Sequence, residues 1–187
     1  RQSYGVVETE IKKVIEKSME LSKETQALKN ALKKPHVRGR WGEVQLKNCI
    51  EMAGMSEYAD LSFQDVNDVD GKKFIPDMVV RMPGGRRVVV DAKTPLDGLL
   101  SSLEATDENE KLKETQRHGR QLKEHIRKLG QKAYSEVLDE SADFTVMFLP
   151  NESFLYAALE SEPDLIEYAL EKQILIATPP TFIGLLK

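Results

Sequence analysis

The chain is poor in the residues and segments that define several classes of protein. Cys49 is the single cysteine among 187 residues, which excludes an internal disulfide and a cysteine-based zinc site and suits a reducing compartment. No run approaches the roughly 20 apolar residues of a membrane helix, and the first residues lack the pattern of a signal peptide. We expect Cys49 to lie in a core and not to act as a nucleophile.

Two common sets of enzyme motifs are also missing. The sequence has no Gly-x-x-x-x-Gly-Lys-Ser/Thr loop of the kind that cradles nucleotide phosphates, and it shows no assembled serine or cysteine triad. It has neither an internal repeat nor a low-complexity linker. With 187 residues and 40% hydrophobic content, the chain is long enough for one moderate domain and an extension.

Charge is distributed unevenly along the chain. The formal net charge of -4 argues against a generally basic protein that coats nucleic acid. Residues 111–132 nevertheless carry eight Lys or Arg against two Glu, whereas residues 133–172 carry ten acids and one Lys. A helix with the first composition can follow a phosphate backbone. The alternative is a solvated face of mixed charge that the neighbouring acids neutralise.

The residues around Pro83-Gly84-Gly85 predict an antiparallel hairpin. Residues 78–82 and 88–90 are rich in β-branched side chains, and the Pro-Gly-Gly sequence between them is a turn signal. A three-residue loop would pair Met82 with Arg86 and, further along, Asp77 with Asp91. A two-residue loop would instead place the two aspartates on opposite faces.

Directly opposed, Asp77 and Asp91 would have Cβ atoms about 5 Å apart, and Lys93 would share their face. Two like charges in this arrangement destabilise a sheet unless something compensates them, and Mg²⁺ binds through one or two carboxylates while keeping several waters. Lys93 could orient a water that attacks a phosphodiester. The alternative is a surface hairpin in which Asp91 and Lys93 form a solvated ion pair.

A helix expected over residues 41–53 carries an acid on its apolar face. Glu43 shares that face with Leu46, Ile50 and Ala53 at helical spacing. A buried carboxylate costs several kcal/mol unless it is paired or bound to metal, which makes Glu43 a candidate ligand. The alternatives are a first-turn glutamate favoured by the helix dipole, or one paired with Arg38 or Arg40.

The N-terminal residues follow a heptad pattern. Apolar or small residues recur at alternating spacings of four and three at Val7, Ile11, Val14, Ser18, Leu21, Thr25, Leu28 and Leu32. Pro35 ends the pattern. A helix of about 27 residues would be about 40 Å long, which favours a dimeric or larger coiled coil over the alternative of a single helix lying on the body.

The remaining pattern predicts an α/β protein with a mixed sheet flanked by helices. Pro95 and Gly98 are expected to break the chain before a long helix. We expect strands over residues 60–66, 74–82, 86–92, 143–149 and 174–177, and helices over residues 109–129, 153–160 and 164–173.

Several motifs together resemble one known family. Pro76-Asp77 followed by Asp91-Ala92-Lys93 looks like the PD-(D/E)XK motif of the restriction-endonuclease-like nucleases, a short and weak signal. From about residue 30 to the end, the chain closely resembles the RmuC family of bacterial DNA recombination proteins. The motifs are KPHVRGRWGEVQL at 34–46, IEMAGM at 50–55, PDMVVRMPGG at 76–85, VDAKTPL at 90–96, FLPNE at 148–152 and IATP at 176–179.

The resemblance implies a restriction-endonuclease-like αβββαβ core over residues 35–187, preceded by a coiled-coil-like helix over residues 1–34. It implies a role in DNA recombination and, from the fold, phosphodiester cleavage that depends on Mg²⁺ or Mn²⁺. Nuclease relatives sometimes present a glutamine from the long helix, where Gln121 lies on one face with His118 and His125. The alternative for the two histidines is pairing with acidic neighbours. The expected catalytic residues are Glu43, Asp77, Asp91, Lys93 and Gln121. The expected metal ligands are Asp77, Asp91, Glu43 and the carbonyl of Ala92.

DNA is the expected partner of the basic residues. Those expected to contact it are Arg38, Arg40, Arg117, Arg120, Lys123 and Arg127. The runner-up function is a noncatalytic scaffold that binds DNA or a protein and oligomerises through its coiled coil. Relatives commonly carry an N-terminal membrane anchor, so we expect this chain to be a fragment of a longer protein. We also expect its C-terminus to be truncated. The domain is expected to lie in the cytoplasm and not to contact the membrane itself.

Overall fold

The computed structural model describes residues 26–27, 29–61, 77–92, 95–136 and 142–187. The chain forms two compact units, Arg1–Arg38 and Gly39–Lys187. In the first unit, helical residues 26–27 and 29–32 lead to a turn at Lys33 and Lys34. Most of the heptad pattern lies outside the described residues, so the coiled coil stays a prediction.

Helix α2 (Pro35–Ala53) begins earlier than the sequence pattern indicated. The predicted start at Trp41 is wrong, because Pro35 occupies the first helical position, where the missing N–H needs no partner. The helix ends at Gly54, which adopts a φ of 71°. There the Met55 N–H donates to the Ile50 carbonyl at 3.0 Å, which satisfies a carbonyl of the last turn.

A mixed five-stranded sheet has the order β1-β2-β3-β4-β5. The strands are β1 (Ala59–Leu61), β2 (Met78–Arg81), β3 (Arg87–Asp91), β4 (Ala142–Phe148) and β5 (Ile174–Ala177). The first three strands pair antiparallel, and β3, β4 and β5 pair parallel. The predicted α/β class and mixed sheet are confirmed. Predicted strand residues 62–66 and 74–76 lie outside the described residues.

The β2–β3 hairpin has the register expected for a three-residue loop. Met78 pairs with Val90, and the Met82 N–H donates to the Arg86 carbonyl at 2.8 Å. Gly84 and Gly85 adopt φ angles of 79° and 78°, which residues with a Cβ rarely adopt. The two-residue alternative is thereby excluded.

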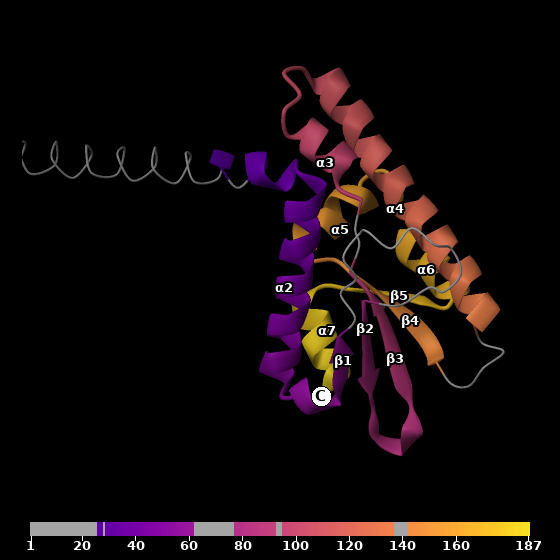
Figure 1. Ribbon diagram of the computed structural model, residues 1–187. Coiled ribbons are helices and arrows are strands. Elements are labelled where there is room, and N and C mark those ends of the chain that lie inside the picture. The colour runs from indigo at the N-terminus through magenta and orange to yellow at the C-terminus, as the bar shows by residue number, and fades with distance from the viewer. Residues whose placement is uncertain (1–25, 28, 62–76, 93–94, 137–141) are drawn as a thin grey trace, which may run out of the picture. The chain divides into compact units, whose positions relative to one another are not determined.

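Helices cover both faces of the sheet in the Gly39–Lys187 unit (Figure 1). One core joins α2 and α7 (Pro179–Leu186) to the sheet, and the other joins α4 (Glu108–Glu136), α5 (Glu152–Leu159) and α6 (Leu165–Glu171) to its opposite face. Strand β4 serves both cores, since Val146 and Phe148 enter the first, while Met147 and the residue after the strand, Leu149, enter the second. This alternation is the period of two that a strand covered on both faces requires.

Two short helices were not predicted. Gly98 was expected to break the chain, but it lies inside α3 (Asp97–Ser102). Only glycine permits this close approach of α3 to α4, because an added Cβ would lie 2.5 Å from the His118 backbone nitrogen. Helix α7 begins with a capping box between Thr178 and Thr181. Among the described helices, none has the length and apolarity that crossing a membrane requires.

Candidate functional site

The acidic pair lies where the β2–β3 hairpin meets the rest of the sheet. Asp77 immediately precedes β2 and Asp91 ends β3, and the register of the Met78–Val90 pair, extended by one residue, sets them opposite each other. Each is 5% exposed. Strand alternation puts both on the face that α4 covers, together with Met147. Lys93 lies outside the described residues.

Hydrogen bonds fix both carboxylates. Asp77 Oδ2 accepts from the Ala92 backbone N–H at 2.8 Å, and Asp91 Oδ1 lies 2.9 Å from Nε2 of His125 on α4. Buried carboxylates require such partners because they lose their hydration on folding. The end of β3 is therefore held on one side by Asp77 and on the other by α4.

Helix α2 approaches the same strand end through Gly42. An added Cβ on this buried glycine would lie 3.3 Å from the Ala92 carbonyl oxygen, the backbone atom expected to bind metal. Glu43, the next residue, is half-buried beside Leu46 and Ile50, which are fully packed in the core as predicted. The preceding residue, Trp41, packs edge-on against Phe154 at 5.9 Å between ring centroids.

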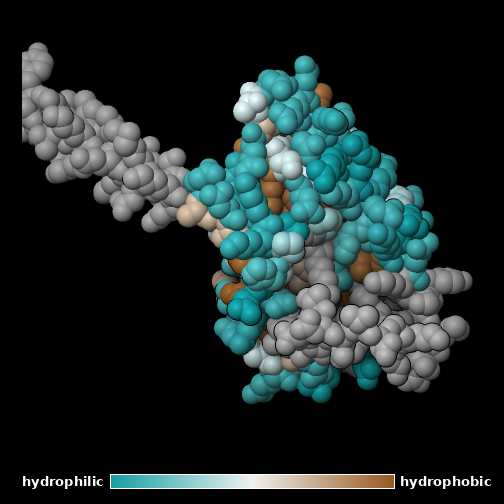
Figure 2. All heavy atoms as spheres, turned by 45° about the horizontal axis from the view of Figure 1, so that its top comes forward, coloured by the Kyte–Doolittle hydropathy of each residue, from teal (hydrophilic) through white to brown (hydrophobic). Residues whose placement is uncertain are grey.

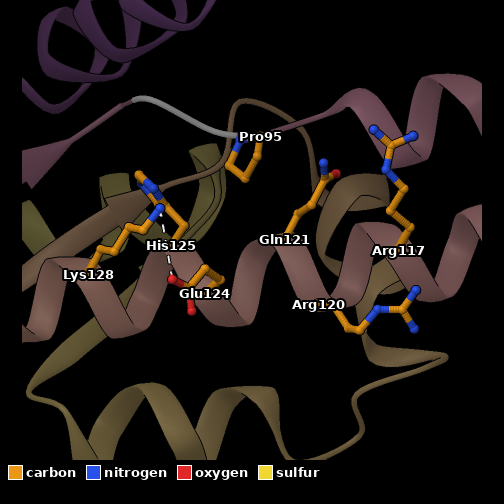
Figure 3. Close-up of a pocket in the computed structure, with 7 residues that line it drawn as sticks. All are labelled: Pro95, Arg117, Arg120, Gln121, Glu124, His125 and Lys128. Carbon is orange, nitrogen blue, oxygen red and sulfur yellow. Dashed lines mark ion pairs between the residues drawn. The ribbon is translucent and has the colours of Figure 1, made fainter.

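A groove of about 370 Å³ follows one side of α4, and we call it the α4 groove. Figure 3 shows that Pro95 faces the α4 side chains from the segment ahead of α3. The groove is lined by Pro95, Arg117, Arg120, Gln121, Glu124, His125 and Lys128. His125 thus belongs both to the groove and to the acidic pair.

Gln121, expected to be catalytic, has a structural contact in this groove. Its Oε1 accepts from the backbone N–H of Gly98 at 3.0 Å. Gly98 is in the first turn of α3, where N–H groups have no partner within the helix. Gln121 therefore caps α3 from α4 and lies one helical turn from His125.

The basic residues expected to bind DNA are engaged to different degrees. Arg117 pairs with Glu114 at 3.0 Å, and Arg127 donates to both carboxylate oxygens of Glu124 at 2.8 and 2.7 Å. Arg120 makes no hydrogen bond or ion pair with any residue in the described part of the chain. In α2, Arg40 is exposed, and Arg38 donates to the Leu32 carbonyl at 3.5 Å.

Lys123 ties α4 to the turn between α5 and α6. Its Nζ lies 2.7 Å from Glu162 and 3.5 Å from Asp164, and it stands over the Tyr168 ring at 5.2 Å. The hydrogen bond to Glu162 raises the pKa of Lys123 above its ordinary value, with a further contribution from Asp164. Acids from the region that follows α4 in sequence therefore neutralise this lysine. This is the alternative to DNA binding that sequence analysis raised for the basic segment.

The donor set at the strand end suits a hard cation in chemical type. Among the residues that the structure describes, no group of three or more His, Cys, Asp or Glu side chains is placed to hold a metal ion. Two opposed carboxylates are nevertheless within the ligand number of Mg²⁺, which retains several waters. The residues available to such an ion are Asp77 and Asp91, together with the carbonyl of Ala92, which follows Asp91, and Glu43, which follows the Gly42 that approaches this carbonyl.

Two further titratable residues are buried in the body of the protein. Cys49 belongs to the α2 core as predicted, and burial raises the pKa of its thiol. His118 is fully buried, with Nε2 2.8 Å from the Phe154 carbonyl and no partner for Nδ1 among the described residues. Burial lowers the pKa of His118, which favours the neutral ring.

His125 and Lys128 were not among the predicted site residues, although both line the α4 groove. The available signal was the helical spacing of His125 from Gln121, which puts both on one face. The contact of His125 with Asp91 depends on how α4 packs on β3, across 34 residues of sequence.

Comparisons with known proteins place this geometry in context. A family model described as the RmuC family matches residues 1–187. A DNA recombination protein RmuC homolog of Chlamydia muridarum is 36% identical over 186 residues, covering 100% of this chain and 42% of that protein. Homologs from Zymomonas mobilis and Pseudomonas aeruginosa are 38% and 31% identical, covering 97% and 95% of this chain and 41% and 40% of theirs. No solved structure matches the chain.

Proposed function

Because the chain belongs to the RmuC family, we propose that it is a DNA-recombination domain that cleaves phosphodiester bonds with a divalent metal ion. Its relatives are named as DNA recombination proteins, and the chain spans about two-fifths of their length. The observation that carries the proposal is the burial of Asp77 directly opposite Asp91. A bound cation would offset the repulsion between the two carboxylates.

The element order supports a restriction-endonuclease-like core. One helix, three antiparallel strands, a long helix and a strand parallel to β3 follow one another as α2, β1, β2, β3, α4 and β4. In such a core the acids lie at the hairpin and at the end of its second strand, where Asp77 and Asp91 stand. The short helix α3 is an addition between β3 and α4.

In this proposal Asp77 and Asp91 hold Mg²⁺ or Mn²⁺, with the Ala92 carbonyl and Glu43 as further oxygen donors. The bound ion would lower the pKa of a water and stabilise the charge that develops on the phosphate. Lys93 would position the nucleophile, and Gln121 would support the site from α4. Fixed side chains at this position lower the cost of organising the transition state.

DNA is the partner in this proposal, and the N-terminal heptad pattern would bring two or more chains together. The exposed cations of α2 and α4 would contact phosphates without reading sequence. Dimerisation is tested by sedimentation of the 187-residue chain across a range of concentrations. A mass that stays that of one chain at every concentration would remove the coiled coil from the proposal.

Cleavage of linear single-stranded and double-stranded DNA with Mg²⁺ or Mn²⁺ tests the activity. Asp91→Asn and Lys93→Ala should each abolish metal-dependent cleavage. Asp60→Asn is the matched control, since Asp60 is an exposed acid of the same sheet that pairs with Arg81. No cleavage by the unchanged chain, or equal cleavage by Asp91→Asn and Asp60→Asn, would contradict the assignment.

A noncatalytic scaffold is the second candidate, and the contact between His125 and Asp91 favours it. A carboxylate already bonded to imidazole at 2.9 Å has a partner without any metal. Calorimetric titration with Mn²⁺ separates the two functions. A nuclease site should bind Mn²⁺ and lose it in Asp91→Asn, whereas a scaffold should keep its DNA affinity through that change and bind no ion.

A further inference from the structure

The α4 groove concentrates positive charge next to the acidic pair. Arg117, Arg120 and Lys128 face a single carboxylate, that of Glu124, among its lining residues. Gln121 and His125 complete the polar lining (Figure 3). Figure 2, which turns the upper part of Figure 1 forward, shows a mostly hydrophilic surface over the described residues that face the viewer. The excess of positive charge in the groove therefore suits a small anionic group.

The ion pairs of the described residues leave part of this charge uncompensated. Glu124 accepts two short hydrogen bonds from Arg127, which lies outside the groove, and lies 3.8 Å from Lys128. Arg117 is paired with Glu114, also outside it. Arg120 has no ion pair with any described residue. Of the three cations in the groove, Arg120 therefore has no acidic partner among the described residues, whereas Arg117 and Lys128 each share one.

His125 joins the groove to the acidic pair. Its side chain lines the groove and its Nε2 lies 2.9 Å from Asp91 Oδ1. A group held in the groove is therefore separated from the Asp91 carboxylate by a single side chain. Arginine presents a planar fork that matches phosphate oxygens, and lysine supplies a point charge beside it.

We propose that the α4 groove binds a phosphate of the DNA strand next to the phosphate that is cut. The assignment rests on the proposed nuclease function and adds to it a subsite for a neighbouring phosphate. Two sources share this chemistry: the terminal 5′-phosphate of a strand and an internal phosphodiester. The basic residues of α4 are thereby divided, because Lys123 and Arg127 lie outside the groove with acidic partners of their own.

Fluorescence anisotropy of the 187-residue chain with labelled single strands tests the subsite in EDTA, where metal-dependent cleavage cannot occur. The strands are a 5′-phosphorylated linear one, a 5′-hydroxyl linear one and a circle. Arg120→Gln and Lys128→Gln should each weaken binding about tenfold and reduce the slope of log K against log salt by about 0.7. Lys47 is an exposed lysine of α2 outside the groove. The control Lys47→Gln removes the same charge and should leave both the affinity and the salt slope unchanged.

The three strands distinguish the source of the phosphate. Loss confined to the 5′-phosphorylated strand supports a terminal phosphate, and equal loss on all three, the circle included, supports an internal one. The subsite is overturned if Arg120→Gln and Lys128→Gln bind every strand with the affinity of the Lys47→Gln control. It is also overturned if the wild-type chain binds none of the strands. Far-UV circular dichroism confirms that each variant is folded.

Cleavage assays on the same proteins separate the subsite from the nuclease. If the wild-type chain cuts DNA and the groove variants bind like the control, the subsite fails and the nuclease stands. If no metal supports cleavage but the groove variants lose affinity, the phosphate site stands and the nuclease fails.

Discussion

At the scale of single residues, His118 links stability to pH. Burial lowers its pKa below the ordinary value of 6.5, so the unfolded chain binds more protons than the folded one as the pH falls. Its contribution to stability is complete above about pH 6.5 and decreases as the pH falls through that value towards the folded pKa. Urea denaturation at pH 7.5 and 5.5 should show the decrease.

The matched change for this prediction is His118→Gln, which keeps an amide donor for the Phe154 carbonyl but cannot be protonated. Its stability should fall less between the two pH values than that of the wild type. His36 and His125 remain in both proteins, so the difference between them reports His118 alone. Equal losses in both proteins would show that His118 does not carry the linkage.

Gly98 is the glycine whose missing side chain matters most for packing. A Cβ there would lie 2.5 Å from the His118 nitrogen and 2.9 Å from its Cα, both backbone atoms that cannot rotate away. Gly98→Ala should therefore lower the free energy of unfolding by about 1–3 kcal/mol.

Gly184→Ala is the control for that change. Gly184 lies inside α7 with no described atom within 4 Å of an added Cβ, so alanine should raise stability by about 0.5–1 kcal/mol. Thermal denaturation followed by circular dichroism measures both. Equal destabilisation by the two changes would mean that the approach of α3 to α4 is looser than described.

Among the site residues, those set by local geometry were predictable. The Pro-Gly-Gly loop fixes the parity of the hairpin, and that parity places Asp77 opposite Asp91. Pairing of His125 with an acid was one of the sequence interpretations, but its partner Asp91 was not predictable, because that contact depends on the packing of α4 across the sheet. The same is true of Gln121, whose partner Gly98 was interpreted as a chain break.

At the scale of elements, Lys123 fastens α4 to the α5–α6 turn. Lys123→Gln should lower the free energy of unfolding by at most about 1 kcal/mol, since its side chain is 32% exposed and solvent screens the pair. The loss should shrink at high salt. Lys111→Gln, on the same helix but without an ion pair to any described residue, should change stability by less than about 0.5 kcal/mol. Chemical denaturation at low and high salt compares them, and a salt-independent loss would assign the effect to packing on Tyr168.

Helix boundaries were the part of the element pattern that sequence predicted least well. Residues 35–40 contain Pro, Gly and charged residues and show no apolar periodicity, yet they form the first turns of α2. Helix α7 carried a readable signal, a Thr-Pro-Pro-Thr start followed by Phe182 and Leu186, which was not interpreted as a helix. Strand β5 matched its prediction at both ends, because an apolar run of this kind is bounded by polar residues.

At the scale of the whole molecule, the Gly39–Lys187 unit should unfold as one body although it has two cores. Strand β4 contributes alternate side chains to each, so neither core can be lost without the strand they share. Leu46→Ala in one core and Leu122→Ala in the other should each cost about 2–5 kcal/mol. Both should shift a single urea transition without changing its slope. A second transition in either variant would show that the cores are independent.

The α/β class and the mixed sheet were predictable at this scale, because alternating strand patterns and one long amphipathic helix specify them. Which helices cover which face was not, since that depends on contacts between distant segments. The position of α2 against the end of β3 is one such contact, made possible by Gly42 beneath the Ala92 carbonyl.

The packing of Trp41 also gives the chain an optical label of its own. It is the single tryptophan, so indole emission from this protein has one origin. Its ring stands 5.9 Å from Phe154, and its neighbour Gly42 lies under the backbone next to Asp91. Binding of the proposed metal ion to the acidic pair should therefore change this emission, which a titration can follow without a dye or an isotope attached to the protein.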